Sequence, residues 1–245
     1  MADEGVPCVL VHGVRTTRTM WRAQVEALTR SGVRVLAIDL PGHGERAGER
    51  FTLEGAVEAV AQAADAVGGR ALVVGLSLGG YVAVRHAARH PAQVAGLVLS
   101  SCSTRPWGAV VGAWAAGARV LERLPDRGAA LNAWAVRKAL PAAGAVDVAA
   151  GGFTLDVMPD VLAEVRASTP LEDLGAVTAP VWLVNGRWDH FRGEERRFLA
   201  ACQDGRLVVL PGATHLVSLV RPVAYTRVLL DVLHEVEQRE ADARR

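Results

Sequence analysis

The sequence is poor in cysteine, with only three such residues among its 245. Cys8, Cys102 and Cys202 lie far apart, and the sequence has no Cys-x-x-Cys pair or other metal-ligand spacing. These features exclude a disulfide framework and a cysteine-bound metal site, and a sparse, odd set of cysteines is typical of reduced thiols. We therefore expect a cytoplasmic location and no bound metal.

The sequence also lacks a long apolar segment and an excess of charge of either sign. Its longest apolar run, Ala109–Ala118, is shorter than the roughly 20 residues that a membrane-spanning helix needs. Its first residues do not join a basic segment to an apolar one, as a signal peptide does. The 27 basic and 26 acidic residues leave a net charge of +1. We expect no nucleic-acid binding and no membrane insertion. The expected oligomeric state is a monomer or homodimer.

What the sequence does contain is an alternation of short apolar runs with longer amphipathic ones. The short runs are almost entirely apolar, as strands buried on both faces of a parallel sheet are. The expected strands are Cys8–Val11, Val33–Ile38, Ala71–Val74, Val94–Leu99, Val181–Val184 and Leu207–Leu210. The expected helices are Met20–Ser31, Leu53–Val67, Leu78–His90, Glu194–Ala201 and Pro222–Gln238. This order predicts the α/β class, with a doubly wound, mostly parallel sheet of about six strands.

One long segment interrupts this alternation after the fourth expected strand. Residues 103–168 are rich in alanine and glycine, and helical spacing is present in Ala109–Leu124 and Ala129–Ala139. A segment of this length is too long for a plain loop. We therefore expect residues 1–102 and 169–245 to form the core, and residues 103–168 to form a helical cap, or lid, over one edge of the sheet.

Two local structures are expected in the second half of the core. Thr169 and Glu172 have the spacing of a capping box, with Pro170 at the first helical position between them. The charged tail EQREADARR is expected to be a solvated and frayed end.

Polar residues follow several of the expected strands. The third strand runs into Gly75-Leu76-Ser77-Leu78-Gly79, a G-x-S-x-G pattern that is short enough to occur by chance. Asp189 comes after the fifth strand, and His215 comes after the sixth. Because functional groups of an open α/β sheet gather beyond the carboxyl ends of its strands, we expect these three side chains at one edge.

These stretches resemble the α/β-hydrolase fold, in which a catalytic serine, an acid and a histidine occur in this chain order. The resembling stretches are VLVHG, DLPGHG, VVGLSLGG, APVWLVNGRWD and LPGATH, and they span nearly the whole chain. Only seven residues precede Cys8, which is too short for the strand hairpin that begins many relatives. This start resembles the methylesterase and hydroxynitrile-lyase branch of the fold. The resemblance implies a serine esterase-like enzyme with a catalytic triad of Ser77, Asp189 and His215.

The residue types fit this chemistry. Small residues at positions 75 and 79 leave room for a sharp turn, the nucleophile elbow, which holds Ser77 in a strained conformation. A serine hydroxyl needs a base to take its proton, and an imidazole, with an ordinary pKa near 6.5, is suited to this task. A carboxylate such as Asp189 fixes the imidazole tautomer. The backbone N–H of Leu78 lies at a helix N-terminus, where negative charge is favoured. The resemblance implies Val14 as the second donor of the oxyanion hole.

Three functions are compatible with this pattern. The leading hypothesis is a serine-dependent hydrolase that cleaves a small or medium hydrophobic carboxylic ester, lactone or thioester through an acyl-enzyme on Ser77, with no metal or organic cofactor. The second keeps the triad without hydrolysis, as a lyase, cyclase or cofactor-free perhydrolase in a biosynthetic pathway. The third is a small-molecule receptor on a hydrolase scaffold, against which the intact triad argues.

Other residues near these positions have two interpretations each. Arg15 follows the implied oxyanion residue, and it would either reach a substrate carboxylate or lie exposed. Trp107 and Trp134 would either line an apolar pocket for the substrate or serve as ordinary core of the cap. His12 is expected to be a buried support of the oxyanion loop.

Overall fold

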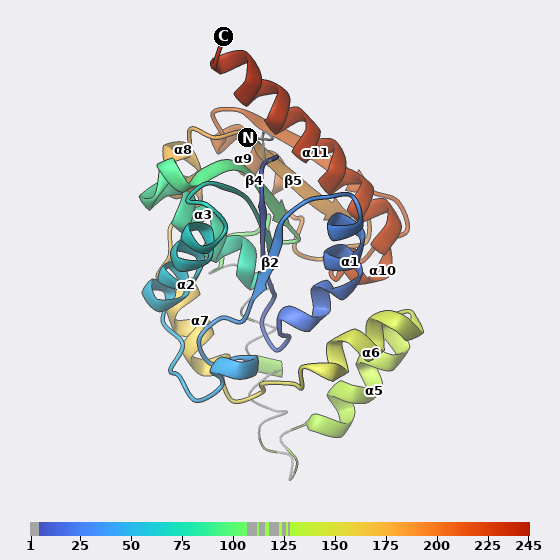
Figure 1. The fold of residues 1–245 in the computed structure, drawn as a ribbon. Coiled ribbons are helices and arrows are strands. Elements are labelled where there is room, and N and C mark those ends of the chain that lie inside the picture. The colour runs from blue at the N-terminus through green and yellow to red at the C-terminus, as the bar shows by residue number, and fades with distance from the viewer. Residues whose placement is uncertain (1–4, 107–111, 113–115, 118–122, 124–125, 127) are drawn as a thin grey trace.

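The structure is a computed structural model that describes residues 5–106, 112, 116–117, 123, 126 and 128–245 (Figure 1). Its strands are β1 (Cys8–Val11), β2 (Val35–Ile38), β3 (Ala71–Leu76), β4 (Val94–Ser100), β5 (Val181–Gly186) and β6 (Gly205–Leu210). They form one sheet in the order β2-β1-β3-β4-β5-β6, and every neighbouring pair is parallel. From β1, the sheet continues to β2 on one side and through β3, β4 and β5 to β6 on the other. The expected doubly wound sheet of six strands is therefore confirmed.

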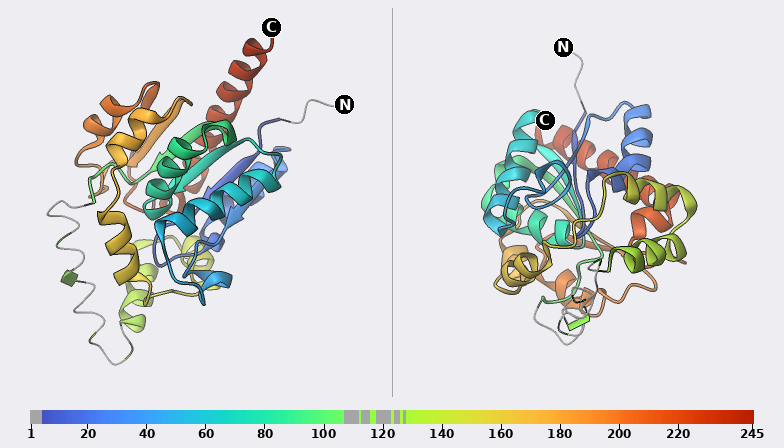
Figure 2. Two further views of the ribbon diagram at one scale, coloured as in Figure 1. Left: turned by 90° about the vertical axis from the view of Figure 1, so that its left-hand side faces the viewer. Right: turned by 90° about the horizontal axis from the view of Figure 1, so that it is seen from below.

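Helices cover both faces of this sheet (Figures 1 and 2). The helices of the core are α1 (Arg22–Arg30), α2 (Leu53–Ala66), α3 (Leu78–Arg89), α8 (Pro170–Ala176), α9 (Glu195–Ala201), α10 (Val217–Val220) and α11 (Pro222–Ala243). Short 3-10 turns are η1 (Arg18–Trp21), η2 (Gly44–Arg46) and η3 (Pro91–Gln93). Val9 and Val11 of β1 are buried with residues of α2, α3, α8 and α9, whereas Cys8 and Leu10 are buried with residues of α1, α10 and α11. This alternation explains why β1 is apolar at every position.

Three more helices lie between β4 and α8. They are α5 (Ala129–Ala139), α6 (Ala142–Ala150) and α7 (Met158–Arg166). In Figure 1, α5 and α6 lie at the end of the molecule opposite the two termini. Most of the expected helix Ala109–Leu124 lies outside the described residues. The division into a core of residues 1–102 and 169–245 and a cap of residues 103–168 stays a prediction.

The expectation of a frayed charged tail is wrong. Helix α11 continues to Ala243, and its last turns project beyond the sheet (Figure 2). Ion pairs hold this end in place, because Glu240 lies 2.8 Å from the Nε atom of Arg70 and 3.6 Å from Arg244.

The expected capping box at Thr169 is also wrong. Helix α8 begins at Pro170, but the Thr169 side chain makes no capping hydrogen bond. Its ψ of 67° differs from that of Thr52, which caps α2 with a ψ of 149° and accepts a hydrogen bond from the Gly55 N–H. The backbone conformation of Thr169 therefore decides against the cap.

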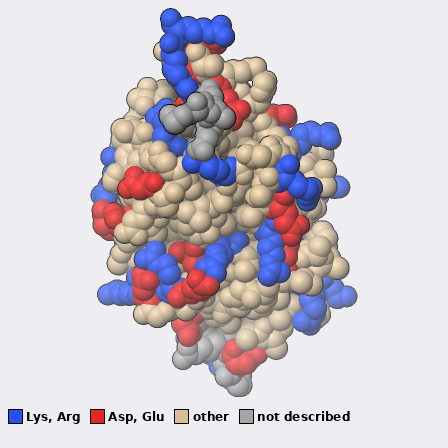
Figure 3. All heavy atoms as spheres, in the orientation of Figure 1, with Lys and Arg blue, Asp and Glu red and all other residues tan. Residues whose placement is uncertain are grey.

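One face of the molecule carries side chains of both charges. On the face shown in Figure 3, basic and acidic side chains lie beside one another. Among the described helices, none combines the length and the apolar character needed to cross a membrane.

Candidate active site

Ser77 occupies the turn between β3 and α3. The strand ends at Leu76 and the helix begins at Leu78, so a single residue makes the connection. Its φ of 54° and ψ of −114° are strained for a residue with a side chain. A Cβ atom at position 75 would overlap the Gly79 backbone, and one at position 79 would overlap the Val11 carbonyl oxygen. Only glycine at these two positions allows the turn to approach β1 this closely.

Ser77, His215 and Asp189 lie in one hydrogen-bonded series. The Nε2 atom of His215 lies 3.1 Å from Ser77 Oγ, and its Nδ1 atom lies 3.0 Å from Asp189 Oδ1. A carboxylate accepts only, so Nδ1 carries the hydrogen and Nε2 is free to accept the serine proton. The three side chains come from the carboxyl ends of β3, β6 and β5, and they meet at one edge as expected.

Asp189 is held in its ionised form. Only 5% of the residue is exposed, and its Oδ1 atom also accepts the Phe191 N–H at 2.9 Å. Burial by itself would raise the pKa of Asp189, but His215, the Phe191 N–H and the Ser101 hydroxyl together keep it below its usual range. Ser101 follows β4 with a φ of 56°. The sequence analysis missed this residue, although its place directly after a buried strand was the available signal.

Two backbone N–H groups are free beside Ser77. Among the described residues, the amides of Val14 and Leu78 have no hydrogen-bond acceptor. The loop that carries Val14 is fixed by the fully buried His12, whose Nδ1 donates to the Gly13 carbonyl at 2.7 Å and whose Nε2 accepts the Leu40 N–H at 3.0 Å. Burial lowers the pKa of His12 to about 3, so its ring stays neutral.

A mostly apolar cavity of about 230 Å³ lies next to Ser77. The described residues that line it are Gly13, Val14, Arg15, Thr16, Leu76, Ser77, Leu78, Asn132, Val136, Val148, Phe153, Val161, Leu162, Val165, His190, Phe191, His215 and Leu216. This volume lies below the usual range of roughly 300–1,000 Å³ for ligand pockets. The cavity is therefore suited to a small substrate.

Arg15, Trp107 and Trp134 were the residues with two interpretations, and of these Arg15 lines the cavity. Trp134 lies on α5 with 52% of its surface exposed, and it does not line the cavity. Asn132 and Val136, four residues apart and thus on one helix face, take that role. Trp134 lies midway between them in the sequence and therefore points away from the cavity. Trp107 lies outside the described residues.

His190 and Phe191 pack against the catalytic candidate His215, and the sequence analysis did not anticipate either contact. Their ring centroids lie 5.0 and 4.9 Å from that of His215. Asp189, His190 and His215 also offer ligand atoms within 4.8 Å of one another, the one such group in the described part of the chain. A metal ion bound there would compete for Asp189 and His215. The expectation that the protein needs no metal or organic cofactor stays a prediction.

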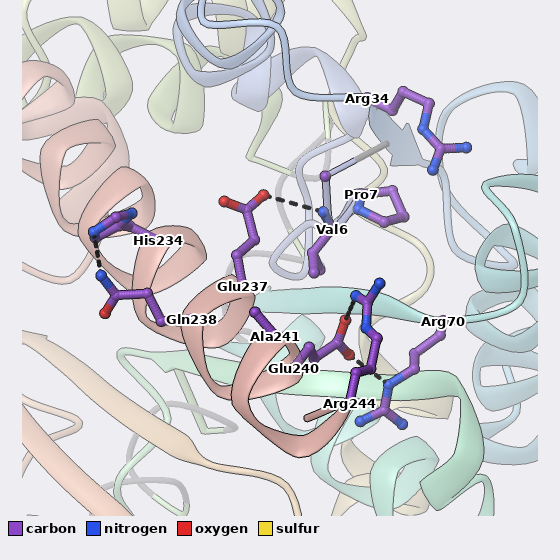
Figure 4. A pocket seen from close by; sticks show the side chains of 11 residues that line it. Val6, Pro7, Arg34, Arg70, His234, Glu237, Gln238, Glu240, Ala241 and Arg244 are labelled. Atoms are coloured by element: carbon purple, nitrogen blue, oxygen red, sulfur yellow. Dashed lines mark hydrogen bonds and ion pairs between the residues drawn. The ribbon is translucent and has the colours of Figure 1, made fainter. Parts of the chain in front are cut away.

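A second hollow of about 480 Å³ lies at the opposite end of the sheet, near the start of β1 and the end of α11 (Figure 4). It is larger, but its charged side chains already have partners within the chain. Arg70 and Arg244 pair with Glu240, and Glu237 accepts the Val6 N–H. Because ligands of open α/β sheets bind at the carboxyl ends of the strands, the smaller cavity is the candidate site.

Comparisons with known proteins point to one family. A model of the alpha/beta hydrolase family matches residues 8–228. The pimeloyl-(acyl-carrier protein) methyl ester esterase of Nitrosomonas europaea is 37% identical over 111 residues, which are 42% of this chain and 43% of that protein. The chain thus aligns with less than half the length of this relative.

Two solved structures resemble the whole fold. A malate-bound thermophilic esterase from Thermogutta terrifontis has a TM-score of 0.75 at 26% identity, over 95% of this chain and 91% of that chain. A hydrolase from Pseudomonas aeruginosa PA01 has a TM-score of 0.77 at 27% identity, with the same two coverages.

Proposed function

The chain belongs to the alpha/beta hydrolase family, and from this premise we propose that it hydrolyses a small carboxylic ester through an acyl-enzyme on Ser77. The observation that carries this proposal is the hydrogen-bonded series from Ser77 Oγ through His215 to Asp189. The names of two similar proteins, a methyl ester esterase and a thermophilic esterase, support an ester as the substrate.

Acylation uses the geometry at Ser77. The serine oxygen attacks the ester carbonyl carbon while its proton passes to His215 Nε2. The Val14 and Leu78 amides then donate hydrogen bonds to the oxyanion of the tetrahedral intermediate. When this intermediate collapses, the carbon–oxygen bond to the alcohol breaks, and the departing alkoxide takes the proton from His215.

Deacylation repeats these steps with water. His215 takes a proton from a water molecule as the water oxygen attacks the acyl carbon. The oxyanion of the second tetrahedral intermediate accepts hydrogen bonds from the same two amides. Collapse breaks the bond to Ser77 Oγ, which takes the proton back from His215. Asp189 holds the imidazole in the required tautomer and stabilises its positive charge during both steps.

Residues 103–168 would act as the lid of this site. Seven of the residues that line the cavity come from α5, α6, α7 and the connection between them, among them Val136, Val148 and Phe153. These side chains are mostly apolar, so they favour a substrate with a hydrophobic part and exclude water from the reacting groups.

Labelling and turnover test this proposal together. We expect a fluorophosphonate probe to label Ser77, as located by mass spectrometry, and the protein to hydrolyse short-chain esters. Ser77→Ala should lose the label and lower kcat by about 1,000-fold or more. Ser31→Ala, which changes an exposed serine at the end of α1, serves as the matched control and should keep both properties.

The outcomes separate the alternatives. No label at Ser77 and no turnover of any ester would overturn the proposal. A label at Ser77 without ester turnover would favour a lyase, cyclase, perhydrolase or receptor, because these keep a reactive serine without hydrolysis.

A further inference from the structure

Arg15 stands out among the residues beside Ser77. It is the one Lys, Arg, Asp or Glu among the described residues that line the cavity of about 230 Å³. The remaining side chains there are apolar, neutral polar or imidazole. A single cation in such surroundings creates a strong local preference for one anionic group.

The guanidinium of Arg15 has no partner in the described part of the chain. Its Nε atom is buried without a hydrogen bond, and no ion pair or side-chain hydrogen bond reaches it. Every other described arginine without such a partner is exposed, whereas Arg15 is half-buried. Arg18, three residues later, pairs with Glu45 and Asp39. A buried donor without an acceptor is costly, so a site that keeps one is suited to an acceptor from outside the chain.

The backbone holds Arg15 in this place. Its φ of 63° lies in the left-handed region, where glycine is favoured. The Arg15 N–H donates to His43 Nε2 at 3.4 Å, and the Thr16 hydroxyl donates to the Gly13 carbonyl at 2.8 Å. Strain of this kind persists only where the surroundings enforce it, and it gathers at functional sites.

The electrostatics agree with the geometry. Burial lowers the pKa of Arg15, whereas the hydrogen bond to Glu45 raises the pKa of Arg18. Arg15 therefore lacks the carboxylate that neutralises its neighbour. A planar guanidinium binds a carboxylate through two parallel hydrogen bonds, which gives direction as well as attraction.

We propose that Arg15 binds a carboxylate on the substrate, so that the preferred substrate is a small ester with a second, ionised carboxyl group, such as the half-ester of a short dicarboxylic acid. This inference rests on the proposed ester hydrolase function. The ester group and the second carboxyl group must both fit inside this small cavity. Only a short carbon chain can therefore separate them.

The kinetic test compares matched substrates. The probes are the monomethyl esters of succinic, glutaric and adipic acid, each beside its counterpart in which a neutral carboxamide replaces the free carboxylate. For at least one chain length, we expect wild type to favour the carboxylate in kcat/KM by about tenfold or more. Arg15→Gln should bring this ratio to within about threefold of one, chiefly by raising KM for the half-ester.

Two further variants sharpen this comparison. Arg15→Lys keeps the charge but not the planar fork, and it should retain only part of the preference. Arg30→Gln removes the same charge from an exposed position at the end of α1 and should leave the preference intact. A wild-type ratio near one at every chain length, or a preference that survives in Arg15→Gln, would overturn the proposal.

A binding measurement separates this proposal from the proposed function. Calorimetric titration of Ser77→Ala with the same half-esters and carboxamides needs no turnover. We expect Ser77→Ala to bind the half-ester more tightly than the carboxamide, and the Ser77→Ala, Arg15→Gln double variant to lose this difference. That result would support the role of Arg15 even if no ester were hydrolysed. Equal affinity for both probes would overturn that role even in an active esterase.

Discussion

At the scale of the residue, Ser101 contributes to how the acid of the site is held. The hydroxyl of Ser101 and the Oδ2 atom of Asp189 are both buried, and neither has a hydrogen-bond partner in the described part of the chain. Since the Ser101 hydroxyl helps to lower the pKa of Asp189, its removal should raise that pKa. Asp189 must be ionised to orient His215. We predict that Ser101→Ala moves the acid limb of the profile of kcat/KM against pH to higher pH.

The control for Ser101→Ala is Ser103→Ala. Ser103 is also buried, but its hydroxyl accepts a hydrogen bond from Asn185 Nδ2 at 3.3 Å and does not contribute to the pKa of Asp189. Its profile should keep the acid limb of wild type. An unchanged profile for Ser101→Ala would show that the hydroxyl does not support the carboxylate.

The carboxylate of Asp189 can be tested with little change of shape. Asp189→Asn keeps the size of the side chain but allows an amide N–H to face His215, which favours the wrong tautomer. We predict that kcat on an activated ester falls by about 1,000-fold or more, with the free energy of unfolding changed much less. A loss below about tenfold would mean that another group orients His215.

The sequence allowed prediction of the convergence of Ser77, Asp189 and His215, because strand ends in a parallel sheet meet at one edge. The place of Ser101 directly after a buried strand was visible in the sequence, but the contacts that Ser101 and His190 make were not. Both depend on which way a side chain turns after its strand ends, and no residue pattern reports that direction. For the same reason, Arg15 had two interpretations until its surroundings were seen.

At the scale of the element, the junction of β3 with α3 has no spare volume. A Cβ atom at Gly79 would overlap backbone oxygens of β1 and His12, which cannot move without breaking the sheet. We predict that Gly79→Ala lowers the free energy of unfolding by about 3 kcal/mol or more, as measured in urea.

Gly32→Ala provides the comparison for this glycine. Gly32 has a φ of 81° but nothing within 4 Å of the added carbon, so only backbone strain of about 1 kcal/mol is expected. An equal loss of unfolding free energy in the two variants would mean that the backbone at the junction of β3 with α3 shifts to accommodate the added carbon.

The element boundaries show what apolar patterning can report. β1 has the expected bounds, and β3 and β5 run beyond their apolar cores to Leu76 and Gly186. The added residues of these two strands are also buried, but Gly75, Asn185 and Gly186 carry no apolar side chain, so the apolar run underestimates the strand there. In β2 the apolar run overestimates the strand, which begins at Val35 and not at Val33. For helices, apolar patterning reports less, as Trp134 shows. Helix α5 is rich in alanine and has no clear apolar face, so its sequence does not tell which side faces the cavity and which faces solvent.

At the scale of the whole molecule, buried histidines make stability depend on pH. His86 is fully buried, and neither ring nitrogen has a hydrogen-bond partner in the described part of the chain. Burial, with a smaller effect of His90, lowers the pKa of His86 to about 4. Between its ordinary pKa of about 6.5 and this value, the unfolded chain binds a proton that the folded chain does not. The free energy of unfolding therefore falls as the pH falls through this window.

Replacing His86 tests this linkage. We predict that His86→Leu reduces the stability lost between pH 6.5 and pH 4.5 by about 2 kcal/mol, measured as the difference between urea unfolding curves. His234→Leu, which changes an exposed ring on α11, should leave the dependence on pH as in wild type. An unchanged loss in His86→Leu would mean that other groups bind the protons.

The order of the strands also has a consequence for the chain during its synthesis. Ser77 follows β3, whereas Asp189 and His215 follow β5 and β6, which join the sheet only through β4. A chain still attached to the ribosome can complete the serine turn long before either partner has been translated. In the proposed mechanism, its hydroxyl then has no base, and we expect the nascent protein to be inert toward esters. The proposed hydrolytic activity would then arise only at the end of translation, when the last two strands dock.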